Sequence, residues 1–395
     1  METYPTLTLR PGKEESLKRY HPWIFSGALQ TVPPGLAEGD TVHVVDATGR
    51  PCATGHYQPG SIAVRVLAFG AAQLDRTFWQ TRLHEAIALR RHLGLPSAAT
   101  DMYRLVHGEG DGLSGLIVDY YAGLAVIQCH SMGFYRVRHK IAALLHEAMG
   151  DTLTAVYDKS AGSLPFKAEA GAVDGYLTGG PQAWYGTEHG LRYRVDPAGG
   201  QKTGFFIDQR DSRALLMQYA RGRRVLNTFS YTGGFSVAAL QGGAVLVDSV
   251  DSSRGAVALA VENVQLNFGE GAPHQGLAVD VFDFFQQTHE RPYDLIVLDP
   301  PAFAKHHKVL DRALKGYRRL NQQAFAQVAP GGIVFTFSCS QAVSRDDFRR
   351  AVFTAAALSG RRVRILHQLS QPPDHPVDIY HPEGEYLKGL VLAVE

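Results

Sequence analysis

The chain has 395 residues, which is too long for a single ordinary core and implies two or three domains. Apolar residues make up 45% and charged residues 19%, the profile of a folded globular protein rather than a disordered one. Because the formal net charge is +1, any surface that binds nucleic acid must be a local patch and not a global field.

Cysteine usage and hydropathy narrow the class further. Cys52, Cys129 and Cys339 are far apart and form no CxxC pair, which argues against a structural zinc site and fits a reducing compartment. The N-terminal segment has no apolar core of signal-peptide length, and no window reaches transmembrane length. We therefore expect a soluble, cytoplasmic protein without a metal or a membrane partner. Its oligomeric state, a homodimer included, stays open.

Residues 1–70 are expected to form a small β-rich module. Residues 41–46 alternate like a strand and are followed by a turn over 47–50, and residues 61–67 alternate again. A short segment near 14–20 is the one helical stretch. This texture is compatible with a compact barrel.

Residues 71–190 are predicted to form a small α+β domain. Apolar residues at helical spacing within 78–89 indicate an amphipathic helix, and a second helix is expected over 134–149. Strands are expected at 103–106, 116–120, 124–128, 154–157 and 193–195. The order strand, strand, helix, strand, strand is typical of an α+β unit, which the last of these strands is expected to close.

Residues 191–395 alternate regularly between apolar strands and helices. Strands are expected at 224–227, 244–251, 276–279, 295–298 and 332–337, and helices at 235–240, 253–267, 281–287 and 315–328. Such a βαβ series predicts an α/β fold with a Rossmann-like, doubly wound parallel sheet that carries helices on both faces.

Three strand ends in this last region have the residues of a nucleoside-binding site. The first βα turn, 225–235, contains a Gly pair that lets the backbone approach a ligand, but it is neither GxGxxG nor a P-loop. Asp251, at the end of the second strand, is placed to face a ribose hydroxyl pair. Asp280 can accept from an adenine amino group, with Val281 and Phe282 as apolar cover. For both acids the alternative is that they only cap the helix that follows.

The most specific signal follows the fourth strand. Asp299 is followed by Pro300 and Pro301, which cannot continue a ladder and force a rigid, extended exit at the edge where such sheets bind ligands. An aromatic residue nearby, Phe303, can stack on a base. Cys339 ends the next strand and is a candidate nucleophile, although a buried cysteine is usually inert.

These motifs resemble class I methyltransferases of the RlmI type, which are ribosomal RNA cytosine-carbon-5 methyltransferases of the large subunit. The resemblance rests on Phe-Ser-Tyr-Thr-Gly-Gly-Phe at 229–235, Asp-Pro-Pro-Ala-Phe at 299–303 and Phe-Ser-Cys-Ser at 337–340. It extends through 202–206, 208–213, 21–27 and 384–389, and so covers essentially the whole chain.

The resemblance implies an N-terminal PUA domain over 1–70, a linking α+β domain over 71–190 and a catalytic domain over 191–395. It implies S-adenosylmethionine as the methyl donor and large-subunit ribosomal RNA as the partner. The residues that it assigns to the methyl donor are Gln209, Arg210, Asn227, Phe229, Ser230, Tyr231, Thr232, Gly233, Gly234, Phe235, Asp251, Ser252, Asp280, Val281, Phe282 and Asp299. Those assigned to the base and its strand are Pro300, Pro301, Phe303 and Lys305.

The reaction that the resemblance implies explains why a cysteine is needed at position 339. Carbon 5 of cytosine is too poor a nucleophile to take a methyl group directly, so the thiolate of Cys339 adds to carbon 6 while Asp299 stabilises charge near the base nitrogen. The target base must leave its stack to reach the pocket. Many related enzymes carry a second cysteine directly after the Asp-Pro-Pro motif, where this chain has Ala302, so the final proton acceptor is unassigned.

Two alternatives remain open at this point. Asp-Pro-Pro-x-Phe also resembles methyltransferases that modify a guanine nitrogen and need no cysteine. A non-catalytic RNA-binding or assembly factor is the alternative from a different class. The candidate RNA contacts are the residues 305–308 and the N-terminal cations Arg10, Lys13, Lys18, Arg19 and Arg65, which Glu14, Glu15 and Glu38 offset.

Overall fold

The computed structural model describes residues 3–165, 171–287, 292–304 and 309–395. The chain divides into two compact units. The first comprises Met1–Thr187, Val195–Ile207 and Pro373–Gly384, and the second comprises Glu188–Arg194, Asp208–Pro372 and Glu385–Glu395. Within the described residues no helix is both long and apolar enough to cross a membrane. The three predicted domain boundaries stay a prediction.

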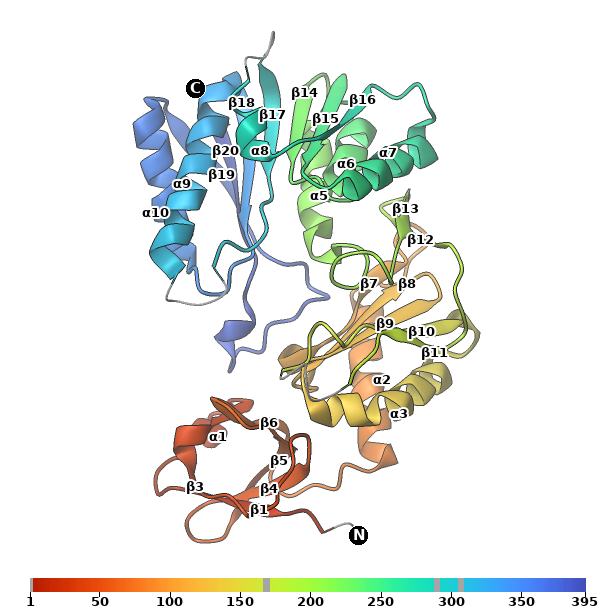
Figure 1. Cartoon of the computed structure of the whole chain (residues 1–395), viewed down its shortest axis with the longest axis vertical. Helices are drawn as coiled ribbons and strands as arrows, with labels where there is room; N and C mark the ends of the chain where they lie inside the picture. The colour runs from red at the N-terminus through yellow and green to blue at the C-terminus, as the bar shows by residue number, and fades with distance from the viewer. Residues whose placement is uncertain (1–2, 166–170, 288–291, 305–308) are drawn as a thin grey trace. The chain divides into compact units, whose positions relative to one another are not determined.

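The first unit begins with a curved six-stranded sheet (Figure 1, red to orange) in the order β2-β6-β5-β4-β1-β3. Its strands are β1 Thr6–Leu9, β2 Trp23–Phe25, β3 Leu29–Thr31, β4 Thr41–Val45, β5 Pro51–Tyr57 and β6 Ile62–Phe69. Alternate residues such as Leu7, Leu9, Val42 and Val44 are fully buried in its core, which explains the alternation of β4. The short helix α1 Glu15–Lys18 lies where the sequence predicts it.

A five-stranded sheet, ordered β11-β10-β9-β8-β7, follows in the same unit. It consists of β7 Met102–His107, β8 Leu116–Tyr121, β9 Leu124–Cys129, β10 Ala155–Asp158 and β11 Gly175–Thr178. Two helices share its core, α2 Arg76–His92, capped by Asp75, and α3 Met132–Met149, capped by Ser131. The expectation that 193–195 closes this sheet is wrong. That segment belongs to β13 Leu191–Val195, which pairs with β12 Trp184–Glu188, and β11 takes the sheet edge.

The second unit contains a seven-stranded sheet in the order β16-β15-β14-β17-β18-β20-β19. Its strands are β14 Arg224–Thr228, β15 Leu246–Asp251, β16 His274–Ala278, β17 Tyr293–Leu298, β18 Val328–Ser338, β19 Val363–Leu369 and β20 Lys388–Val394. The predicted α/β sheet is present, but it is not wholly parallel, because β20 runs antiparallel to both of its neighbours.

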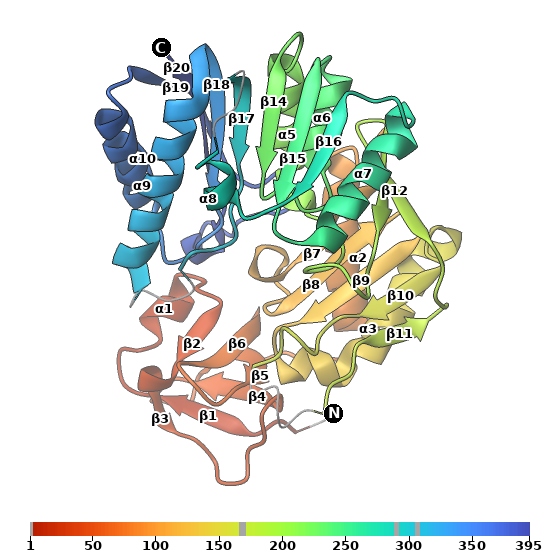
Figure 2. The ribbon, with the colours of Figure 1, turned by 45° about the horizontal axis from the view of Figure 1, so that its top comes forward.

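Helices cover both faces of this sheet (Figure 2). They are α5 Arg210–Tyr219, α6 Gly234–Gln241, α7 Arg254–Phe268, α8 Val281–Phe284, α9 Leu310–Gln327 and α10 Arg345–Ser359. Along β17, Ile296 and Leu298 pack under α8, α9 and α10, whereas Leu295 and Val297 pack under α5 and α6. A strand buried on both faces is why this segment is apolar without alternation.

A buried ion pair anchors α5 in the second unit. Arg213 Nε and Nη2 donate to the two carboxylate oxygens of Glu188, both at 2.6 Å, and both side chains are almost completely buried. Two parallel charged hydrogen bonds of this kind are strong, and neither ion can reach water if its partner is removed.

Removing one partner of this pair should therefore destabilise the protein strongly. We expect Glu188→Gln to lower the free energy of unfolding by about 3–5 kcal/mol, because it removes the carboxylate that forms the buried ion pair with Arg213. Urea unfolding measures this, and the double variant Glu188→Gln/Arg213→Met is the control that should recover part of the loss. A loss below about 1 kcal/mol, the size typical of an exposed pair, would contradict the assignment.

Candidate active site at the carboxyl edge of the sheet

Five parallel strands of the second unit end at one edge of the sheet. The pairings β16–β15, β15–β14, β14–β17 and β17–β18 are all parallel. The predicted site residues therefore gather at that edge: the glycine turn after β14, Asp251 at the end of β15, Asp280 after β16, Asp299 after β17 and Cys339 after β18.

The glycine turn has a strained backbone. Phe229, Tyr231 and Gly233 have φ of +53°, +43° and +76°, and the two aromatic residues are unusual in this left-handed region. At Gly233 a side chain would also collide with α7, since an added Cβ would lie 2.8 Å from the Cβ of Ala260. Strain that is held by the surrounding structure is typical of a ligand-binding turn.

Asp251 holds that turn in place. Its carboxylate accepts from the backbone N–H of Tyr231 at 3.0 Å and from that of Ser253 at 2.9 Å. The N-cap of α7 is Ser253, whose hydroxyl accepts from Ala256 N, so the alternative that Asp251 only caps this helix is wrong. Asp280, by contrast, is the N-cap of α8, and its Oδ1 accepts from Phe282 N and Asp283 N.

Three polar atoms beside the turn are buried without a partner among the described residues. They are Gln209 Oε1, Asn227 Oδ1 and Ser230 Oγ. Leaving such an atom unsatisfied costs about 1–3 kcal/mol, so a water molecule or a polar ligand bound here would be stabilised by them. These atoms, together with the exposed end of Asp280 and the half-buried ring of Phe282, can hold a nucleoside with a charged tail.

The second half of the site joins the ends of β17 and β18. Cys339 Sγ lies 3.9 Å from the carbonyl oxygen of Pro300, as the donor of a weak S–H hydrogen bond. Ser340 Oγ accepts from Ala304 N at 3.3 Å and is bonded to the hydroxyl of Tyr317 at 2.9 Å. The Asp-Pro-Pro segment is thereby fastened to the strand that carries the cysteine.

Lys388 is a site residue to which the sequence assigned no role. It is the first residue of β20, is opposite Ser338 in the strand pairing and has only 4% of its surface exposed. Its Nζ donates to the carbonyl oxygen of Ser340 at 2.6 Å. Burial lowers the pKa of Lys388 to about 8, although the negative charge of the Cys339 thiolate opposes this. A buried cation next to the cysteine favours the thiolate.

The other predicted residues take varied positions. Pro300 is buried and Pro301 exposed, while Phe303 is half-buried with its ring 4.7 Å from that of Tyr317. Lys305 and the rest of 305–308 lie outside the described residues.

Two of the N-terminal cations suggested for RNA are engaged within the first unit. Arg65 forms an ion pair with Glu109 at 2.9 Å, and Lys18 forms one with Glu15 at 2.5 Å. This weakens the case for an RNA-binding face built from them.

The lowered pKa of Lys388 predicts a pH-dependent stability. In the unfolded chain this lysine titrates near its usual pKa of 10.5, so between pH 8 and 10.5 the unfolded state binds more protons than the folded state. Below pH 8 Lys388 is charged in the folded state, and the burial of this charge lowers the free energy of unfolding by its whole amount. This loss becomes smaller as the pH rises and the buried lysine becomes neutral. Relative to Lys388→Met, the wild type should gain on the order of 2–3 kcal/mol across that window.

Urea unfolding of both proteins at several pH values from 7 to 10 measures the difference. Lys315→Met is the control, because Lys315 is exposed and should show no such change. If the free energies of unfolding of the wild type and of Lys388→Met changed equally with pH, the lowered pKa of Lys388 would be refuted.

Comparison with known proteins agrees with this geometry. Residues 154–391 match the model of the S-adenosylmethionine-dependent methyltransferase family, and residues 7–69 match that of the PUA-like domain. The chain is 39% identical to ribosomal RNA large subunit methyltransferase I of Salmonella newport, over 99% of this chain and 98% of that protein. The protein of the same name from Klebsiella pneumoniae is 38% identical over the same shares.

A solved structure covers the whole chain. The crystal structure of SMU.776, described as a putative methyltransferase complexed with S-adenosylhomocysteine, aligns with a TM-score of 0.85 and 25% identity over 99% of this chain and 100% of that chain.

Proposed function

The chain belongs to the S-adenosylmethionine-dependent methyltransferase family, and from that premise we propose that it forms 5-methylcytosine in large-subunit ribosomal RNA. The predicted fold class, enzyme class and methyl donor are confirmed by the family match. The nucleic-acid substrate, the reacting atom and the role of each residue are what we propose here. We also propose the three-domain division at 1–70, 71–190 and 191–395 and a cytoplasmic location.

The methyl donor fits the first half of the site. Its ribose hydroxyls suit the Asp251 carboxylate, and its amino acid end suits the unpartnered polar atoms of Gln209, Asn227 and Ser230. Phe282 and Val281 supply apolar cover for adenine beside Asp280. When bound, S-adenosylmethionine supplies an electrophilic methyl group. The chain's own residues orient it and exclude water.

The names of the full-length relatives support ribosomal RNA as the substrate, and a PUA-like match over 7–69 supports an RNA-binding module. The observation that carries the cytosine chemistry is the contact of Cys339 with Pro300 of the Asp-Pro-Pro segment. A half-buried cysteine held against the motif that positions a base has a use in cytosine methylation. It has none in transfer to a guanine nitrogen, which is already nucleophilic.

The Cys339 thiolate, favoured by the Lys388 ammonium, forms a bond to carbon 6, and the electron pair of the 5,6 double bond moves to carbon 5. The carboxyl group of Asp299, carrying a proton, donates it in a hydrogen bond to ring nitrogen 3 and so stabilises the negative charge that develops on the ring. Carbon 5 then takes the methyl group, and the sulfonium donor leaves as the neutral thioether. A base removes the proton from carbon 5, the 5,6 double bond re-forms, and the bond between carbon 6 and sulfur breaks to release the Cys339 thiolate.

Substitution of the cysteine tests this proposal. Purified protein is incubated with large-subunit ribosomal RNA and labelled S-adenosylmethionine, and the product nucleoside is identified by mass. We expect 5-methylcytidine from the wild type and a decrease of roughly 10³-fold or more for Cys339→Ala, as for other lost nucleophiles. Cys52→Ala, which lies in β5 of the other unit, is the matched control and should keep full activity.

Each other outcome has a clear meaning. A methylated guanine made equally well by Cys339→Ala would refute the cysteine mechanism and leave the methyl-donor site intact. No product on naked RNA or on assembled particles, despite binding of S-adenosylmethionine, would favour an RNA-binding assembly factor.

The role of Asp251 has a separate test that needs no RNA. We expect Asp251→Asn to weaken S-adenosylmethionine binding by about 10- to 100-fold, the equivalent of one or two lost charged hydrogen bonds. Isothermal titration calorimetry measures the affinity. Asp283→Asn, an exposed acid on α8, is the control and should bind like the wild type. Equal affinities for all three proteins would exclude Asp251 from the methyl-donor site.

A further inference from the structure

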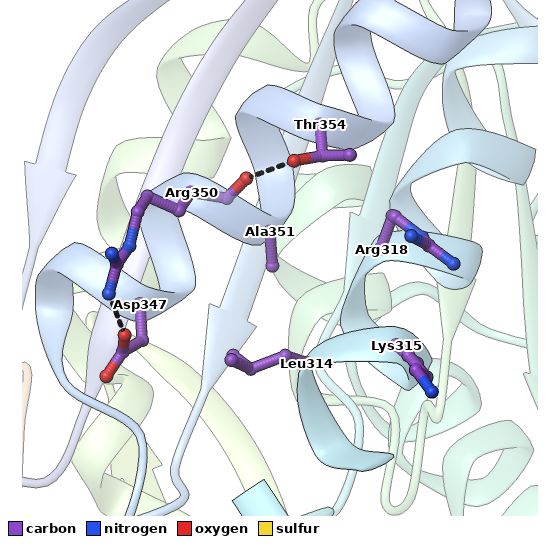
Figure 3. Close-up of a pocket in the computed structure, with 7 residues that line it drawn as sticks. All are labelled: Leu314, Lys315, Arg318, Asp347, Arg350, Ala351 and Thr354. Carbon is purple, nitrogen blue, oxygen red and sulfur yellow. Dashed lines mark hydrogen bonds and ion pairs between the residues drawn. The ribbon is translucent and has the colours of Figure 1, made fainter. Parts of the chain in front are cut away.

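The helices α9 and α10 pack against each other and form a shallow groove on the outer surface of the second unit (Figure 3). Leu314 and Ala351 form its apolar floor, and Lys315, Arg318 and Arg350 rise around it. A neighbouring hollow is lined by Asp346, Arg349, Arg350 and Phe353.

These two helices hold a disproportionate share of the positive charge. Their cations are Arg312, Lys315, Arg318, Arg319, Arg345, Arg349 and Arg350, and their acids are Asp311, Asp346 and Asp347. Seven cations against three acids give a net charge of +4, whereas the whole chain has +1, so all other residues together sum to −3. The patch is therefore local, as a near-neutral nucleic-acid-binding protein requires.

The cations lie toward the N-terminal ends of α9 and α10, where the helix dipole does not favour positive charge. All seven lie in the first part of their helix, within 310–319 and 345–350, and neither helix has a cation in its last turn. The helix macrodipole favours acids near the N-terminus and cations near the C-terminus. The helix dipole therefore does not account for this distribution.

Several of these groups are available to a ligand. Lys315, Arg318 and Arg349 are exposed and have no ion-pair partner in the part of the chain that the structure describes. Arg350 is paired with Asp347, and Arg345 with Glu385. Phe353 is 71% exposed beside Arg349 and Arg350, although burying an aromatic ring of this size is strongly favourable.

The first turns of both helices lie at the edge of the sheet where the site is. The chain reaches α9 from Asp299 at the end of β17, and it reaches α10 from Cys339 at the end of β18. Arg312 and Arg345 lie in these first turns, and Lys315, Arg318 and Arg349 follow within the next two turns. The guanidinium of Arg319 lies 4.7 Å from the ring centroid of Phe282, on the side of the methyl donor.

We propose that the basic first halves of α9 and α10, with Phe353, bind the RNA strand next to the target nucleotide. Lys315, Arg318 and Arg349 contact its phosphates, and the ring of Phe353 stacks on an unpaired base. The inference rests on the proposed RNA substrate and goes beyond it, because it assigns an RNA contact to the catalytic unit in addition to the PUA-like module.

The test measures RNA binding and its salt dependence without methyl transfer. A transcript of large-subunit ribosomal RNA is titrated with the full chain by fluorescence anisotropy at several salt concentrations. We expect Lys315→Glu/Arg318→Glu to weaken binding by about tenfold or more and to reduce the slope of log affinity against log salt by about 2, one for each lost phosphate contact. Phe353→Ala should weaken binding by about fivefold or more with an unchanged slope, because stacking releases no counterions.

The matched control reverses the same number of charges at the other edge of the sheet. Arg221 precedes β14 and Arg362 precedes β19, both are exposed, and Arg221→Glu/Arg362→Glu should change neither the affinity nor the slope. S-adenosylmethionine affinity reports whether each variant is folded and should stay at the wild-type value.

An equal effect of both double variants would overturn the proposal, since it would reflect net charge alone. A normal affinity and slope for Lys315→Glu/Arg318→Glu would overturn it as well. The proposed function fails separately, because an inactive wild type, or one that methylates guanine, still reports its RNA affinity and salt slope.

Discussion

The ion pair of Glu188 and Arg213 is the constraint on which the site depends. It fixes α5, whose first turn presents Gln209 and Arg210, and it sets the guanidinium of Arg213 beneath the glycine turn. An added Cβ at Gly234 would lie 3.1 Å from the Cδ of Arg213, so a larger residue at the start of α6 would displace this side chain by a few tenths of an ångström. Asp208, just before α5, accepts from the hydroxyl of Tyr386 at 2.8 Å. The start of α5 is thus tied both to the methyl-donor turn and to the segment that leads to Lys388.

The sheet divides the chemistry between its two halves. Strands β14, β15 and β16 end at the proposed methyl-donor site, whereas β17 and β18 end at Asp299 and Cys339. The antiparallel strand β20 brings a residue to this edge by its first position, which a parallel strand could not do. Because it runs in the opposite direction, its first residue and not its last lies at the carboxyl edge, and that residue is Lys388. A single reversal in the sheet thereby brings a buried cation to the cysteine.

Sequence patterns correctly predicted the elements that depend on neighbouring residues alone, such as apolar strands and the turns that follow them. The apolar runs of β14 and β17 and the turn residues that follow them identified the edge where the site forms. What the sequence could not show depends on contacts between distant residues. Nothing in 388–394 reveals an antiparallel partner at 332–338, so Lys388 could be quoted in a motif without a role. In the same way, 193–195 has strand character, but its partner is a hairpin strand and not the central sheet.

If α9 and α10 bind RNA as proposed, the placement of charge in this chain determines how the RNA is oriented more than how tightly it binds. With a net charge of +1, the molecule has no strong global field, and the residues outside α9 and α10 together sum to −3. On our proposal, the cations in the first halves of these two helices would attract a polyanion mainly toward the edge that holds Asp299 and Cys339. Complementary charge of this kind fixes the register in which an RNA strand binds, because the strand loses these favourable contacts in any other orientation. The near-neutral composition, which by itself gives no reason to expect RNA, is then what makes a small basic patch directional.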